Sequence, residues 1–151
     1  MKHAICAGAA LLCNLLHLSV SAQVPVRQSL PNKPLLFNQL SSKTNISAVQ
    51  LEQLFSLDAD QHVKIPLGSG TYLTGVVKEK VARNKHVTNV TIECTNYDGA
   101  LLTVSRIGGT GSSITYLGRV VNIRYGDVLL LTGQDDRYYL VKEKASLVIV
   151  E

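Results

Sequence analysis

The sequence has no tryptophan, and its 151 residues include only six tyrosines and two phenylalanines. Proteins that bind single-stranded nucleic acid stack successive bases on aromatic side chains, and carbohydrate-stacking surfaces need the same rings. The shortage of aromatic residues argues against both kinds of platform. Basic residues exceed acidic ones only by 15 to 11, and the signs are mixed, as in Lys78-Glu79-Lys80. A nucleic-acid binder usually carries a clustered basic stripe, so no nucleic-acid partner is expected.

Cysteine is also scarce, with three in the chain. Cys6 and Cys13 fall in an N-terminal segment that we expect to be removed, which leaves Cys94 alone and excludes an intramolecular disulfide in the mature protein. Lipid attachment at Cys13 is an alternative, but Leu12 precedes it where a small residue is expected. Cys94 lies on the apolar face of a predicted strand, which favours a buried thiol over a reactive one.

The N-terminal residues 1–22 have the pattern of a secretory signal peptide. Lys2 supplies a basic start, residues 4–18 are mostly apolar, and Val20-Ser21-Ala22 precedes a cleavage point before Gln23. A membrane span needs about 20 apolar residues, and this run is shorter and interrupted. We therefore expect export to the periplasm or the extracellular space, with no transmembrane segment in the mature chain.

Residues 23–44 are predicted to form a linker or arm, because three of the four prolines lie there (Pro25, Pro31 and Pro34). Proline lacks the N–H that helices and sheet ladders use. The remainder, residues 45–151, has the length of a single domain. Its one predicted helix, 47–57, has Ser47 as N-cap and Gln50 at the third position, the pattern of a capping box. Its apolar face should hold Val49, Leu54 and Leu57, with Leu51 and Phe55 at its flanks, and should cover a sheet.

The rest of the domain is typical of short β-strands. Val90, Ile92 and Cys94 alternate with polar residues, and after a turn at 96–99 the alternation resumes, which predicts a hairpin. Asp98-Gly99 is a strong hairpin signal because glycine accepts the turn's backbone angles. Further strands follow at similar spacing, and Pro66 marks residues 63–67 as an edge strand or strand end. The predicted fold is mainly β: a small antiparallel meander, barrel or sandwich, of six to eight strands with one N-terminal helix.

Two strings in the strand region are similar. The string T-Y-L-T-G-V-V at 71–77 resembles T-Y-L-G-R-V-V at 115–121, and V-K-E-K occurs at both 77–80 and 141–144. A decayed duplication of hairpins and convergence of strands with the same role both explain such strings.

The sequence predicts neither a metal site nor a cofactor. Asp58-Ala59-Asp60-Gln61-His62 begins like a calcium loop, but Val63 replaces the required glycine and Ser69 stands where the bidentate glutamate belongs. A helix-to-strand turn is the expected structure there.

Candidate binding residues are weakly indicated. The glycine-rich connection Ile107–Ser113 contains Gly109 and Gly111, but it lacks the ending of a phosphate-binding loop. Three arginines, Arg106, Arg119 and Arg124, suggest an anion site, with ordinary strand-edge charges as the alternative, and Tyr116 could contribute to a binding patch. No catalytic residue is assigned. A small hydrolase with a site near His62 or His86, the two histidines after residue 22, is an open alternative.

Residues 63–151 resemble, distantly, the β-rich pro-regions of secreted zinc metalloproteases. The resemblance rests on three short strings: S-I-T-Y-L-G-R-V at 113–120, D-V-L-L-L-T at 127–132 and D-R-Y-Y-L-V at 136–141. No catalytic domain follows, and no His-Glu-x-x-His occurs. The resemblance implies a module that binds another protein without catalysis.

The function we expect is thus a non-enzymatic exported β-domain, a binding or accessory module for another exported protein. It would recognise its partner through a strand edge or the 107–113 loop. An inhibitor or detached pro-region of a secreted protease is the alternative suggested by the resemblance.

Overall fold

The computed structural model describes residues 33–108, 113–134 and 137–145, and the predicted last strand, 147–150, lies outside these ranges. Eight strands and one helix are found within the described residues. In chain order they are β1 (Lys43–Ile46), α1 (Ala48–Ser56), β2 (His62–Pro66), β3 (Tyr72–Asn84), β4 (Val87–Cys94), β5 (Leu101–Ile107), β6 (Thr115–Val121), β7 (Asp127–Gln134) and β8 (Arg137–Lys144).

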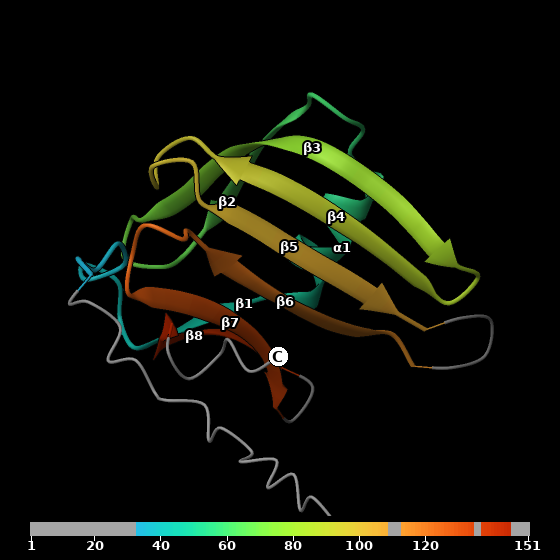
Figure 1. The fold of residues 1–151 in the computed structure, drawn as a ribbon. Coiled ribbons are helices and arrows are strands. Elements are labelled where there is room, and N and C mark those ends of the chain that lie inside the picture. Colours follow the sequence, from blue (N-terminus) through green and yellow to red (C-terminus); the bar gives the residue numbers. More distant parts are fainter. Residues whose placement is uncertain (1–32, 109–112, 135–136, 146–151) are drawn as a thin grey trace, which may run out of the picture.

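All strands belong to one antiparallel sheet in the order β1-β8-β7-β6-β5-β4-β3-β2. From β2 to β8 each strand pairs with the next one in the chain, and β1 returns to pair with β8. The sheet curls into a half-barrel with two free edges, β1 and β2, and α1 lies against its concave side (Figure 1). The predicted mainly-β antiparallel meander with one N-terminal helix is confirmed, and its architecture is an open half-barrel.

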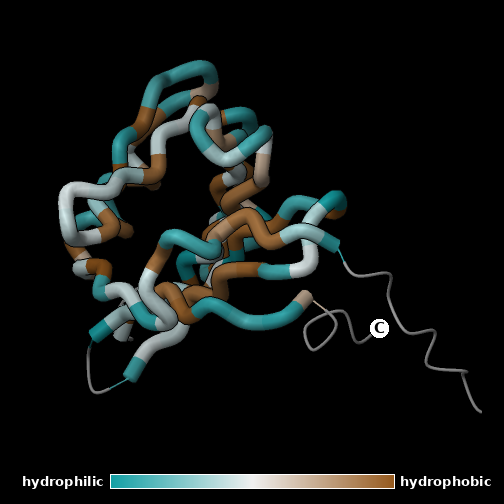
Figure 2. The backbone as a smooth tube through the Cα atoms, turned by 90° about the vertical axis from the view of Figure 1, so that its left-hand side faces the viewer, coloured by the Kyte–Doolittle hydropathy of each residue, from teal (hydrophilic) through white to brown (hydrophobic). Residues whose placement is uncertain are grey.

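The central hairpin follows the predicted alternation. Val90, Ile92 and Cys94 of β4 are fully buried, and they lie next to the buried side chains of Leu102 and Val104 in β5. The turn that joins the strands places Asp98 and Gly99 at positive φ, 51° and 71°. Apolar stretches of the chain gather in the middle of the molecule, whereas the turns at its periphery are hydrophilic (Figure 2).

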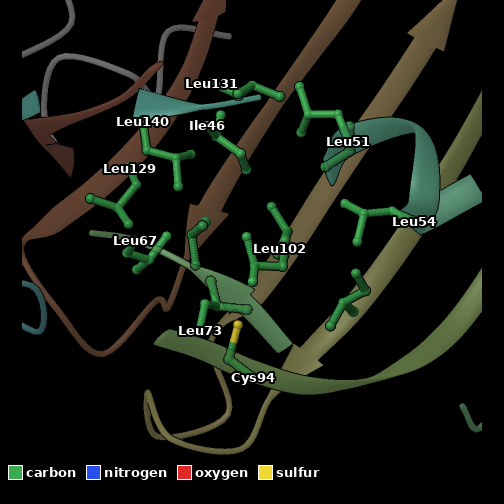
Figure 3. Close-up of a cluster of buried hydrophobic side chains, with 14 of the residues drawn as sticks. Ile46, Leu51, Leu54, Leu67, Leu73, Cys94, Leu102, Leu129, Leu131 and Leu140 are labelled. Atoms are coloured by element: carbon green, nitrogen blue, oxygen red, sulfur yellow. The ribbon is translucent and has the colours of Figure 1, made fainter. Parts of the chain in front are cut away.

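The helix lies on this core through two buried leucines, Leu51 and Leu54, which point toward the sheet (Figure 3). Ser47 and Gln50 form the predicted capping box: each side chain accepts the other residue's N–H, at 3.1 and 2.8 Å. Val49 was predicted on the apolar face, and this is wrong, since its side chain is 68% exposed. At about 100° per residue, position 49 faces away from position 51.

Two glycines allow the sheet to curl. A Cβ at Gly75 would lie 2.5 Å from the Glu93 carbonyl oxygen, and one at Gly118 would lie 2.5 Å from that of Thr103. In both cases the backbone of the paired strand occupies the place of a side chain, so only glycine permits the close approach. The sequence suggested a bulge or bend at Gly75; the register shifts of β3 lie further along, between Val77 and Glu79 and between Ala82 and Asn84.

Residues 33–42 close one end of the half-barrel. Phe37 is fully buried, and its ring lies 5.3 Å from that of Tyr97. The carboxylate of Asp127 accepts the N–H groups of Leu36 and Phe37, and the Lys142 ammonium donates to the Phe37 carbonyl. This part of the predicted arm therefore contributes to the core and extends directly into β1.

Candidate functional site

A groove of about 450 Å³ separates helix α1 from the edge strand β2. We call it the α1–β2 groove. Its floor contains buried Leu54 and Ile65 with half-buried Val63 and Leu57, so it is apolar. Polar groups form its rim: Gln50, Gln53, Ser56, His62 and Lys64. Pockets that hold small ligands or short peptide side chains commonly occupy about 300–1,000 Å³ and combine apolar walls with a few polar groups.

The strand that borders this groove has unpaired backbone groups. The Leu67 N–H donates to Thr71 O at 2.8 Å, and Val77 N–H donates to Gln61 O at 2.9 Å. Gln61 and Leu67 are therefore positions whose backbone groups bond to β3. Such positions occur at every second residue of an antiparallel strand, so Val63 and Ile65 also direct their backbone groups toward β3. The N–H and C=O groups of His62 and Lys64 consequently point to the free edge.

The side chains of β2 alternate in the same way. Val63 and Ile65 face the groove and the core, whereas His62, Lys64 and Pro66 face the convex side. The Lys64 ammonium lies 3.9 Å from the centre of the Tyr72 ring, a cation–π contact with the neighbouring strand β3. Pro66 ends the strand, which confirms the edge position that its presence predicted.

The other edge strand, β1, also has free backbone groups. Lys142 N–H donates to Ser42 O at 2.9 Å, so by the same alternation Lys43 and Asn45 direct theirs away from β8. Lys43 lies 3.8 Å above the Tyr139 ring, much as Lys64 lies above Tyr72. No residue of β1, however, lines the α1–β2 groove.

Two of the residues predicted to bind a ligand, Arg106 and Tyr116, meet on the concave face. They lie opposite each other in β5 and β6, and both reach Glu52 of α1. The Tyr116 hydroxyl donates to the Glu52 carboxylate, and the Arg106 Nε lies 3.1 Å from the same oxygen. Burial, together with the hydrogen bond to the Glu52 carboxylate, raises the pKa of Tyr116 to about 12. This trio attaches the helix to the sheet.

Arg119 lies elsewhere. It belongs to the opposite, convex face of β6, where a shallow depression of about 250 Å³ is lined by Thr103, Ser105, Leu117, Gly118, Arg119 and Leu130. The structure therefore separates Arg119 from Arg106 and Tyr116. Gly109 and Gly111 lie outside the described residues.

The two histidines lie in different parts of the fold. His62 begins β2 on the rim of the α1–β2 groove. His86 lies in the turn between β3 and β4, where its carbonyl accepts the N–H of Gly108 at 2.9 Å. Ser56 is the serine that lines the groove with His62, and its hydroxyl donates to the Gln53 carbonyl of its own helix. In the described ranges no hydrogen bond joins either histidine side chain to a serine or carboxylate.

Residues 58–62 form the expected helix-to-strand turn. Gln61 N–H donates to Asp58 O at 3.3 Å, and Asp60 has a positive φ of 66°. The Asp58 carboxylate lies 3.3 Å from the Lys80 ammonium. Across the parts of the chain that are described, no group of three or more His, Cys, Asp and Glu residues is arranged to hold a metal ion.

Among the described residues, no helix has the length and hydropathy needed to cross a membrane. No protein-family model matches the chain, and neither a curated protein nor a solved structure shows significant similarity to it. The resemblance to metalloprotease pro-regions thus rests on the three short strings alone. Sequence reasoning identified the β2 edge through Pro66, but it missed the groove, because nothing in the sequence shows how far α1 lies from that edge.

Proposed function

We propose that this protein is a non-enzymatic, exported binding module that recognises another protein by adding an extended segment of that partner to the edge of β2. Free N–H and C=O groups on an edge strand form main-chain hydrogen bonds with such a segment, and neighbouring pockets receive its alternate side chains. The observation that carries the proposal is the coincidence of both features at β2: the unpaired backbone of His62 and Lys64 borders the α1–β2 groove.

The β2 edge supports this role better than the β1 edge. β1 is four residues long, and the chain turns from it directly into α1. The α1–β2 groove adjoins the free groups of β2, so a segment added there gains side-chain contacts as well as backbone bonds. Side-chain pockets are what give strand addition its specificity.

Export would place the partner outside the cytoplasm. The signal-peptide pattern of residues 1–22 supports secretion, and the single cysteine that follows it is compatible with an oxidising compartment because no wrong disulfide can form within one chain. Mass spectrometry of the protein recovered from a secreting host should give an N-terminus at Gln23. An intact N-terminus at Met1 in the exported fraction would contradict the export part of the proposal.

The binding part is tested with a displayed library of random peptides selected on the full-length protein. Peptides that enrich should bind the wild type and protect the His62 and Lys64 amides from hydrogen exchange. Selection of peptides that protect only β1 amides, or no enrichment at all, would contradict strand addition at β2.

Proline variants locate the site independently. Lys64→Pro removes an N–H that points away from β3, so the sheet ladder stays intact, and binding of the selected peptides should weaken by about tenfold or more. Asn45→Pro removes the matching N–H on β1 and should leave binding unchanged. Lys64→Ala keeps the N–H but lacks the ammonium group, so comparing it with Lys64→Pro shows how much of the weakened binding comes from the missing N–H. Equal binding by Lys64→Pro and the wild type would contradict the proposal.

A further inference from the structure

The chemistry around β2 also limits which segment fits there, an inference that rests on the function proposed above. We infer that the added strand is an acidic, alternating segment of a partner protein. Its apolar side chains enter the α1–β2 groove, and its aspartate or glutamate side chains face outward beside Lys64 and His62.

Alternation follows from the geometry of the edge. Residues that lie opposite each other in an antiparallel pair place their side chains on the same face of the sheet. A partner residue opposite Lys64 therefore points to the convex side, and its two neighbours point toward the groove. The partner must consequently alternate between two kinds of side chain.

The groove determines which of the partner's side chains can point toward it. Its floor is made by Leu54, Leu57, Val63 and Ile65, and two of these, Leu54 and Ile65, are almost completely buried even without a ligand. An apolar side chain placed there removes further apolar surface from water, worth about 25 cal/mol per Å². A basic side chain on this floor would lose its hydration without meeting a carboxylate, since none lines the groove, and an acidic one would lie away from the Lys64 ammonium, which faces the convex side.

The residues on the convex side determine which of the partner's side chains can face outward. Lys64 is the charged residue among those that line the groove, and its neighbour His62 adds a second nitrogen-bearing side chain. Of the acids nearby in the chain, Asp58 is engaged by Lys80 at 3.3 Å, and Asp60 lies in the turn that precedes β2. A partner carboxylate opposite Lys64 thus meets an ammonium group that has no carboxylate partner among the described residues.

A second copy of this chain fits the same edge poorly. If two β2 strands paired antiparallel with the twofold axis at Lys64, this lysine would lie opposite Lys64 of the other copy. Directly opposed like charges destabilise a strand pair. Pro66 would also contribute no N–H to the shared ladder. The edge is therefore better suited to a different chain than to self-association.

Three soluble peptides of equal length test the inference on the full-length protein by fluorescence anisotropy. In the first, valine alternates with glutamate; in the second, valine alternates with lysine; the third has the composition of the first with its valines and glutamates in separate blocks. The first should bind with a dissociation constant on the order of 10–100 μM, as expected for a short added strand. The second and third should bind about tenfold more weakly or worse.

Charge reversal on the protein gives the decisive comparison. Lys64→Glu should weaken binding of the valine–glutamate peptide and strengthen that of the valine–lysine peptide. Lys43→Glu on β1, where the ammonium also lies above a tyrosine ring, is the matched control and should change neither. Equal binding of the two alternating peptides, or equal effects of the two lysine variants, would overturn the inference.

The outcomes separate this inference from the proposed function. Library peptides that lose binding in Lys64→Pro but carry no acidic residues would leave strand addition standing and overturn the acidic preference. Insensitivity of every peptide to Lys64→Pro would overturn both. Sedimentation showing a dimer that Lys64→Pro dissociates would identify a second copy as the occupant and overturn the inference of a different partner.

Discussion

The carboxylate of Asp127 accepts the main-chain N–H of Phe37 at 2.9 Å, although the two residues are 90 positions apart in the sequence. Its other oxygen accepts the N–H of Leu36 at 2.7 Å. Asp127 is only 3% exposed, and it begins β7 at the end of the half-barrel that Phe37 fills. A buried carboxylate with both oxygens bonded to N–H groups fixes the backbone before Phe37 and positions its ring in the core.

Replacing Asp127 by alanine should therefore destabilise the whole domain. Hydrogen bonds to charged groups contribute about 1.5–3 kcal/mol each, and two N–H groups would lose their acceptor, so the free energy of unfolding should fall by about 3–6 kcal/mol. Asp127→Asn should retain part of this, because an amide has one carbonyl acceptor. Urea denaturation gives the measurement. Glu79→Ala, an exposed acid on β3, is the control and should stay within about 0.5 kcal/mol of the wild type.

Limited proteolysis checks the local part of this prediction. In the wild type the backbone of residues 36–40 is bonded to Asp127 and to Lys142, whose ammonium donates to Leu40 O at 2.8 Å. Cleavage in this segment should become faster in Asp127→Ala than in Glu79→Ala. An unchanged cleavage rate would contradict the anchoring role of the carboxylate.

The bend at Gly118 gives a second prediction. An alanine Cβ there would lie 2.5 Å from the Thr103 carbonyl oxygen and 3.2 Å from the Val104 Cα, both backbone atoms of the paired strand. Backbone that is held in a ladder cannot move aside without loss of hydrogen bonds. Gly118→Ala should thus destabilise the domain by about 1–3 kcal/mol, the range typical of overpacked sites.

Gly133→Ala is the matched control for Gly118→Ala. The nearest atom to a Cβ at Gly133 is the Tyr138 Cε1 at 3.3 Å, which belongs to a side chain that can shift. Its cost should be smaller than about 1 kcal/mol. Equal midpoints of thermal unfolding for the two variants would contradict a sheet curled through close backbone approach at Gly118.

Local patterns predicted the parts of the fold that depend on neighbouring residues. The alternation of Val90, Ile92 and Cys94 identified the buried face of β4, and Ser47 with Gln50 identified the start of the helix. Pro66 identified an edge strand, since only there is a missing N–H harmless. Each of these follows from physics that acts over a few residues.

Contacts between segments that are far apart in the chain produce no local pattern in the sequence. The pairing of Asp127 with Phe37 depends on how the chain returns to the end of the sheet, and the meeting of Glu52 with Arg106 and Tyr116 depends on where α1 crosses the strands. With Arg124, the sequence suggested one anion site for Arg106 and Arg119. Their positions in the β5–β6 register place their side chains on opposite faces of the sheet.

The end of α1 gives a third prediction, because a lysine from another strand caps it. No basic residue lies in the last helical turn, but the ammonium of Lys80 in β3 donates to Leu57 O at 2.8 Å and to Phe55 O at 3.4 Å. A cation at a helix C-terminus is typically worth about 0.3–1 kcal/mol. Lys80→Met should lower stability by about 1 kcal/mol and accelerate amide exchange in α1 more than in β5.

Lys78→Met is the matched control on the same strand. Its ammonium pairs with Glu93 at 3.0 Å on the exposed side, and a surface ion pair of this kind contributes at most about 1 kcal/mol and often nothing measurable. Lys78→Met should leave exchange in α1 unchanged. If both variants accelerate α1 exchange equally, Lys80 does not act as a helix cap.

Tyr116 makes stability depend on pH in the alkaline range. Burial and the hydrogen bond to the Glu52 carboxylate raise its pKa from 10.0 to about 12. The unfolded chain loses the phenol proton near pH 10, whereas the native state keeps it, so between these values the native state binds more protons. Stability must then fall as the pH rises through this window, by up to about 1.4 kcal/mol per pH unit from this group.

Tyr116→Phe removes that contribution. Between pH 10 and 11 the free energy of unfolding should fall less steeply for Tyr116→Phe than for the wild type, even though the variant is less stable at neutral pH because Glu52 loses its donor. Urea denaturation at three pH values gives the slopes. Subtracting the tyrosinate absorbance of the variant from that of the wild type should reveal a group that titrates well above pH 10. A difference curve centred near pH 10, or identical slopes, would show that Tyr116 is not held protonated by its contact with α1.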